Sequence, residues 1–287
     1  MTIAQLIPLA IQISMALIVL GVALNATFGD LTYLLRRPGL LVRSLLSMYV
    51  IMPAFAVAVA LLFDLNPLIE AALVAMALSP VPPILPKKEV KAGGAPSYVL
   101  GLLVVAAVVS IIYVPLAAEL VGRTFGRHVE VSTGRVAFVV ATSIFAALVV
   151  GVGLRARVPS LADKLAKPVT IIGTVVLFAG FLPVLIKMWP SIASLLGDFT
   201  IVAIVAFVLV GLLVGHLLGG PEADDRTVLA LSTATRHPAV AMTILYQAQP
   251  QATVLAALIL VLLVAAVVSL PYVRWQRRSA AATLIST

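Results

Sequence analysis

Nine apolar segments follow one another along the chain, separated by short polar segments. A helix needs about 20 predominantly apolar residues to cross the hydrocarbon core of a bilayer, and most of these segments approach or exceed that length. The pattern therefore predicts an all-α polytopic membrane protein with about nine transmembrane helices. We expect them at residues 3–26, 40–63, 66–92, 97–121, 134–154, 168–188, 199–220, 225–248 and 251–273.

Two of the predicted helices, the third and the eighth, are interrupted by proline. A proline removes a backbone donor and keeps the preceding residue out of helical geometry, so each helix should break there. Membrane proteins tolerate the freed backbone groups only where they line a cavity or are buried in protein. The prolines that mark the two helix breaks are Pro80, Pro82, Pro83 and Pro86 in the third helix and Pro238 in the eighth.

The composition agrees with a membrane protein. Hydrophobic residues make up 62% of the 287 residues and charged residues only 10%, whereas soluble domains are about one-quarter charged. The formal net charge of +8 lies in short clusters between apolar segments, which does not indicate nucleic-acid binding. Most lysines and arginines fall in loops that share one side, and cytoplasmic loops carry such an excess. We therefore expect the N-terminus outside, the C-terminus in the cytoplasm, and insertion in the plasma (inner) membrane.

With this orientation the two interrupted helices run in opposite directions through the membrane. Broken helices at corresponding places in oppositely oriented halves are typical of inverted-repeat transporters. We expect a single transmembrane transporter domain over residues 1–287. The first repeat would span about 1–122 and the second about 133–273, followed by a cytoplasmic tail at 274–287.

Arg236 is the strongest single candidate for a functional residue. At about 1.5 Å of rise per residue, it lies about 15 Å into its helix, near the bilayer midplane. A charge there is costly and normally faces a polar interior. Arg236 is thus either a fixed cation at a substrate cavity or an arginine that joins helices through carbonyls or an acid. His237 is either a proton relay or a neutral histidine bonded to a freed carbonyl.

The other candidates for substrate contacts lie beside the two breaks. If the half-helix after the first break is re-entrant, Lys87, Lys88 and Glu89 face the cavity, and Glu89 neutralises a lysine or Arg236. If that helix ends near Leu85, the three form an ordinary cytoplasmic cluster. The remaining candidates share a small hydroxyl group: Ser79, Ser232, Thr233 and Thr235. Such residues also serve helix packing alone.

The sequence lacks the common catalytic motifs. It contains no HExxH zinc motif, no phosphate-binding glycine loop, no GxSxG turn and no cysteine. We therefore expect no enzyme activity, no catalytic residues, no metal site and no cofactor, with sodium or a proton as the candidate coupling ion. The expected partners are a small organic anion and the lipid bilayer, and the oligomeric state stays open.

Two short motifs resemble the bile acid:sodium symporter family. They are Ala77-Leu78-Ser79-Pro80 before the first break and Arg226-Thr227-Val228-Leu229 before the second. The resemblance covers nearly the whole chain. It implies a core domain in which the two broken helices cross, a panel domain, and a substrate site between them to which access alternates.

The positions that this family uses for sodium carry other residues here. Where the family has a glutamate and a glutamine, this chain has Leu231 and Thr235, and two hydroxyl ligands fall on Val99 and Leu103. Where the family has a Pro-Gly-Gly-Thr-type turn followed by Ser and Asn, this chain has the proline-rich sequence Pro80-Val81-Pro82-Pro83-Ile84-Leu85-Pro86. A hard cation binds poorly without its oxygen ligands.

We therefore expect a secondary transporter of a small organic anion, with fixed positive charge in place of bound sodium. One alternative is a sodium-coupled organic anion symporter whose ligands are backbone carbonyls. The other is a non-transporting sensor or scaffold on the same fold.

Overall fold

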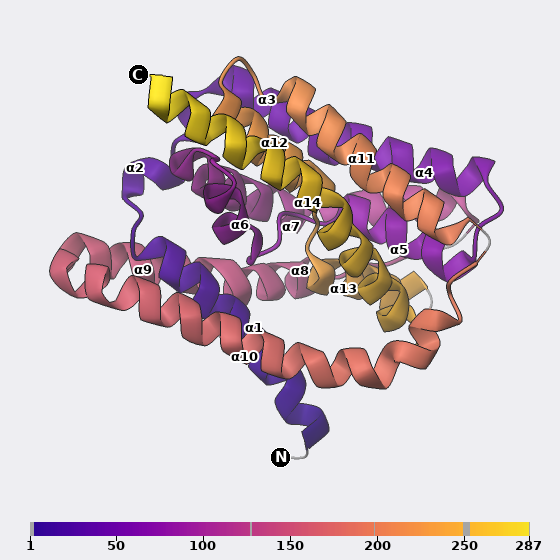
Figure 1. Cartoon of the computed structure of the whole chain (residues 1–287). Coiled ribbons are helices and arrows are strands. Elements are labelled where there is room, and N and C mark those ends of the chain that lie inside the picture. Colours follow the sequence, from indigo (N-terminus) through magenta and orange to yellow (C-terminus); the bar gives the residue numbers. More distant parts are fainter. Residues whose placement is uncertain (1–2, 127, 198, 249–252, 287) are drawn as a thin grey trace.

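All elements in the described part of the chain are helical, as the computed structural model shows for residues 3–126, 128–197, 199–248 and 253–286 (Figure 1). The all-helical fold class is therefore confirmed. In chain order the helices are α1 (Ile3–Ala23), α2 (Phe28–Leu31), η1 (Leu34–Arg36), α3 (Pro38–Leu46), η2 (Ser47–Ile51), α4 (Met52–Leu62), α5 (Pro67–Leu78), α6 (Leu85–Lys91), α7 (Pro96–Thr124), α8 (Thr133–Val140), η3 (Ala141–Phe145), α9 (Ala146–Arg157), α10 (Pro159–Ala193), α11 (Thr200–Leu218), α12 (Ala223–Ala234), α13 (Pro238–Ala248) and α14 (Val254–Ser286).

Six continuous helical segments in the described residues are long and apolar enough to cross a bilayer. They are Pro38–Leu62, Pro96–Thr124, Thr133–Arg157, Pro159–Ala193, Thr200–Leu218 and Val254–Ala280. Each coincides with one of the predicted helices, so the chain is an integral membrane protein. The other three predicted helices are the one that corresponds to α1 and the two interrupted ones. The count of nine spans stays a prediction.

Helix α10 is much longer than the predicted segment 168–188. It runs over 35 residues, or about 50 Å, so its ends extend beyond a hydrocarbon core of about 30 Å. Pro159 is its first residue, a position where a missing N–H costs nothing. Lys164 and Lys167, which the sequence pattern placed in a loop, therefore lie on the first turns of this helix.

The helices fall into two groups (Figure 1). In the smaller group, α1 packs along α10 and against α9. A Cβ atom on Gly173 of α10 would lie only 2.9 Å from the Cβ of Leu17, so glycine permits this close approach. The larger group, here called the main bundle, contains α3 to α7 and α11 to α14. Helix α6 contacts α1 and therefore lies where the two groups meet.

Three glycines hold α12 against α11 in the main bundle. Gly211, Gly215 and Gly219 lie four residues apart, and small residues at that spacing let membrane helices approach closely. A Cβ on Gly215 would lie 2.4 Å from the carbonyl oxygen of Leu229, and one on Gly211 would lie 2.8 Å from the Cα of Ala234. Because Ala234 is the last residue of α12, this contact fixes the position of the second break.

Candidate functional site

The two helix breaks are in direct contact. The first gap runs from Ser79 to Ile84, between α5 and α6, and the second from Thr235 to His237, between α12 and α13. The backbone N–H of His237 donates to the carbonyl of Pro80 at 2.9 Å. The two breaks therefore lie within hydrogen-bonding distance of each other. Pro86 and Pro238 lie in the first turns of α6 and α13, so they begin the second half-helices rather than occupy the gaps.

Arg236 fills the space beside this contact. Its side chain is completely buried and is the largest side chain in that state. The Nη1 atom donates to the carbonyl of Ser79 at 3.2 Å, and Nη2 donates to the carbonyl of Met48 at 2.5 Å. Nε has no partner within the described ranges. Arg236 thus joins the first break, the second break and the helix that contains Met48.

The carbonyl of Met48 is available because of a local irregularity in that helix. Residues Ser47–Ile51 form a turn of π-helix (η2), and Pro53 follows with no N–H to donate to the carbonyls one turn earlier. Arg236 donates a hydrogen bond to the carbonyl of Met48. The hydroxyl of Tyr113 donates to the neighbouring carbonyl, that of Tyr49, at 2.6 Å. Sequence reasoning missed this acceptor, although Pro53 was the signal for it.

His237 is buried in the same region. Its Nε2 lies 3.4 Å from the hydroxyl oxygen of Ser143, which belongs to a second π-helical turn, η3. The Nδ1 atom has no partner in the described part of the chain. One of the two interpretations assumed that the His237 ring bonds a freed carbonyl. In the described part of the chain the ring contacts the hydroxyl of Ser143 instead. No sequence signal pointed to Ser143.

Three of the four hydroxyl candidates are buried and bonded. Ser232 donates to Oε1 of Glu89 at 2.5 Å, and Thr233 lies 3.0 Å from the hydroxyl of Ser47. Ser79 donates to a carbonyl of its own helix, so its hydroxyl closes the end of α5. Thr235 is half-buried and lies in the gap itself. The structure therefore gathers all four within the region of the breaks.

Lys87, Lys88 and Glu89 lie on α6, which continues as a helix to Lys91. They point to three different neighbours. Lys87 is exposed and donates to Thr174 of α10 at 3.0 Å, while Lys88 is half-buried and donates to Ser269 of α14 at 2.6 Å. Glu89 is buried against Ser232 of α12. Glu89 thus pairs with a serine rather than with Arg236, which the sequence had offered as one partner.

Three of the four positions that correspond to sodium ligands in the resembled family are apolar and buried, and the fourth is the half-buried Thr235. Leu231, Val99 and Leu103 are at most 1% exposed and pack in the hydrophobic core. Their side chains carry no oxygen that a hard cation prefers. Two carbonyls beside the contact between the breaks, those of Ser79 and Met48, already accept hydrogen bonds from Arg236.

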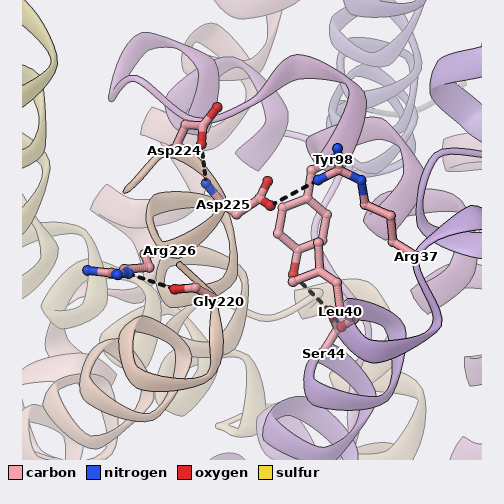
Figure 2. A network of polar contacts seen from close by, with 8 residues as sticks. All are labelled: Arg37, Leu40, Ser44, Tyr98, Gly220, Asp224, Asp225 and Arg226. Carbon is pink, nitrogen blue, oxygen red and sulfur yellow. Dashed lines mark hydrogen bonds and ion pairs between the residues drawn. The ribbon is translucent and has the colours of Figure 1, made fainter. Parts of the chain in front are cut away.

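A second polar cluster lies where α12 begins (Figure 2). Nη1 of Arg37 lies 3.6 Å from Oδ2 of Asp225, and the hydroxyls of Ser44 and Tyr98 lie 2.8 Å apart. Because the Arg37 side chain is 52% exposed, this ion pair contributes little stability by itself. The cluster joins the start of α12 to α3 and α7, so it positions the half-helix that ends at the second break.

Comparison with known proteins adds one match. The family model described as Sodium Bile acid symporter family matches residues 12–188, which is more than half of the chain. The matched region contains the first break, α6 and most of the smaller helix group, and it ends before the second break. Among curated proteins, the comparison found no match.

Proposed function

Because the chain belongs to the sodium bile acid symporter family, we propose that it is a secondary transporter that carries a small organic anion across the membrane. Members of this family are membrane transporters rather than enzymes, which fits the expected absence of a catalytic site. The substrate class, the mechanism and the coupling ion form our proposal.

The direct contact between the two helix breaks is the observation that carries this proposal. The hydrogen bond from His237 to Pro80 joins the breaks in the main bundle, as expected for two crossing helices. We assign the main bundle as the core domain and the group of α1, α9 and α10 as the panel domain. Substrate would bind between them, and access would alternate as one group moves against the other. The inverted repeat and the count of nine spans belong to the same proposal.

Buried positive charge favours an anionic substrate. Both hydrogen bonds of Arg236 go to neutral carbonyl oxygens, so none of these contacts neutralises the guanidinium. Lys88 is half-buried and bonded to a serine hydroxyl, which also leaves its charge unpaired in that contact. Lys87 bridges to α10, where the two helix groups meet. Positive groups of this kind raise the local concentration of anions.

Arg236 also bears on the coupling ion. A sodium ion without carboxylate ligands would need backbone carbonyls freed at the breaks. Arg236 already donates to one such carbonyl, that of Ser79, and to the carbonyl of Met48 in η2, so the fixed guanidinium takes the place of a bound cation. We therefore propose transport without sodium coupling. The rival hypothesis, a sodium symporter with backbone ligands, predicts that a sodium gradient drives uptake.

Counterflow in proteoliposomes tests the proposed function. The vesicles are loaded with a panel of unlabelled organic anions, and the probe is a radiolabelled taurine-conjugated bile acid. We expect exchange by the parental protein, and a loss of about tenfold or more in Arg236→Ala, since a hydrogen-bonded charge contributes about 1.5–3 kcal/mol. Arg135→Ala, which removes an exposed arginine, is the matched control. Exchange by a folded Arg236→Ala protein at the parental rate would remove Arg236 from the mechanism.

A second measurement separates the alternatives. Sodium added to one side of the membrane should leave the uptake rate unchanged, and sodium-stimulated uptake would refute the fixed-charge proposal. If no anion of the panel is exchanged by a correctly folded protein, the sensor or scaffold is favoured instead.

A further inference from the structure

Glu89 is a buried carboxyl group without a basic partner bonded to it. Its side chain is 1% exposed. Oε1 accepts a hydrogen bond from Ser232 at 2.5 Å, and Oε2 has no partner among the residues that the structure describes. Burying an ionised carboxylate is very costly unless it is paired and fully hydrogen-bonded. A proton on Oε2 removes that cost.

The groups around Glu89 leave the carboxyl free to take up a proton. Lys88, its neighbour on α6, donates to Ser269 on α14 instead. Helix α12 faces Glu89 with the hydroxyl of Ser232, and Tyr98 of α7 lies within electrostatic range. Helix α1, which contacts α6, has no ionisable side chain over Ile3–Ala23. Lys88 is thus the cation that acts on Glu89 electrostatically, and it forms no bond that would hold Glu89 in the charged form.

The position of Glu89 connects it to the moving parts of the proposed transporter. Helix α6 directly follows the first break, and α12 directly precedes the second. The Glu89–Ser232 hydrogen bond therefore joins the second half of one broken helix to the first half of the other. On its other side α6 reaches the smaller helix group through α1 and through the contact of Lys87 with Thr174. A change in the charge of Glu89 acts at this junction.

We propose that Glu89 reversibly binds one proton and that this proton replaces sodium as the coupling ion. The inference rests on the proposed function. A proton from the outer solution converts the Glu89 carboxylate to a carboxylic acid with its O–H at Oε2, and release to the inner solution restores the carboxylate. No other bond forms or breaks. One anion and one proton cross together, so the transported pair carries no net charge.

Electrostatics links the proton to the anion. When Glu89 is neutral, the positive charge of Lys88 is no longer offset by its neighbour, so an anion binds more tightly. By thermodynamic linkage, a bound anion increases the proton affinity of Glu89 by the same factor. For charges within about 8 Å at an effective dielectric constant near 20, this factor is on the order of tenfold or more.

Uptake driven by a pH gradient tests the coupling. The probe is the taurine-conjugated bile acid, because its sulfonate stays ionised and a pH gradient cannot move it as the free acid. In sodium-free vesicles with an outer pH two units lower, we expect the parental protein to accumulate the probe up to about 100-fold at equilibrium. Glu89→Gln should lose this accumulation, and its counterflow should no longer change with pH. Glu130→Gln, which alters an exposed carboxyl, should behave as the parent.

The outcomes separate the two proposals. Parental counterflow without stimulation by the pH gradient would refute the proton coupling and leave the proposed function intact. Gradient-driven accumulation by Glu89→Gln at the parental level would refute the assignment to Glu89. Absence of counterflow in the parental protein would overturn the proposed function and, with it, the coupling.

Infrared difference spectra of the full-length protein in lipid examine the proton site without substrate. Acidification should produce the C=O stretching band of a buried protonated carboxyl in the parent and in Glu130→Gln. In Glu89→Gln the band should lose the component that Glu89 contributes, whereas the component of the buried Asp225 remains. An unchanged band in Glu89→Gln would show that the proton binds elsewhere.

Discussion

Replacing Gly215 by alanine tests how the second break is held in place. The added Cβ would lie 2.4 Å from the carbonyl oxygen of Leu229 and 2.5 Å from the Cα of Ala230, whereas ordinary contacts are 3.4–4 Å. Both obstacles are backbone atoms, so no side-chain rotation relieves the overlap. Helices α11 and α12 must therefore separate by about 1 Å, and overpacking of this kind costs about 1–3 kcal/mol. The better helix propensity of alanine offsets at most about 1 kcal/mol of this.

The expected result is a net loss of stability together with a loss of transport. For a protein of this size, 1–2 kcal/mol corresponds to a decrease in Tm of roughly 2–8 °C. The shift of α12 would also move Arg236 away from its two carbonyl acceptors, so counterflow should fall. Thermal unfolding of a fluorescent-protein fusion in detergent, followed by size-exclusion chromatography, measures the Tm.

Gly153→Ala is the matched control for this experiment. Gly153 lies in α9, and a Cβ there would meet no atom within 4 Å, so the substitution changes helix propensity alone. Its Tm should equal or exceed that of the parent. Equal Tm values for Gly215→Ala and Gly153→Ala would refute the idea that Gly211, Gly215 and Gly219 fix the position of α12 against α11.

Three further predictions concern other parts of the chain. Arg236→Lys should lower the Tm, because one ammonium group does not reproduce the planar guanidinium that reaches two carbonyls. Counterflow by this variant should stay below the parental rate. Counterflow by Arg236→Lys at the parental rate would show that only the charge matters. Because the chain has no cysteine, single cysteines report orientation cleanly: a membrane-impermeant maleimide should label Glu130→Cys but not Lys164→Cys in intact cells, and the reverse pattern would invert the predicted topology. Asp30→Ala should lower stability by roughly 1 kcal/mol at neutral pH, since Asp30 completes a capping box and accepts from Ser97 at 2.5 Å. Burial raises the pKa of Asp30, but the hydrogen bonds from Ser97 and its own turn outweigh burial and hold the pKa below its usual value of 3.8. The stabilisation is therefore present above pH 3.8 and is lost as the pH falls through the lower pKa of the folded state, so the parent and Asp30→Ala should converge in acid; a constant difference down to pH 2 would contradict this.

The sequence by itself determined the class of the protein and the places where its helices break. Apolar segments long enough for a bilayer leave few other interpretations, and proline interrupts a helix through its own covalent structure. The buried arginine followed from the same two facts, because a charge within an apolar span has to face protein. The carbonyl of Met48, which sequence reasoning missed, also had a local signal in the proline at position 53.

Only the tertiary structure decided which groups meet. Arg236 binds carbonyls 157 and 188 positions away in the chain, and Glu89 binds a serine 143 positions away. The hydrophobic periodicity of the sequence could not predict these contacts, because helices that face both lipid and an apolar interior are hydrophobic on all sides. The partner of Glu89 could not be chosen between Arg236, a lysine and solvent until the direction of α6 was known. Folding placed it against α12, and that placement turned a charged residue beside a break into a candidate proton site.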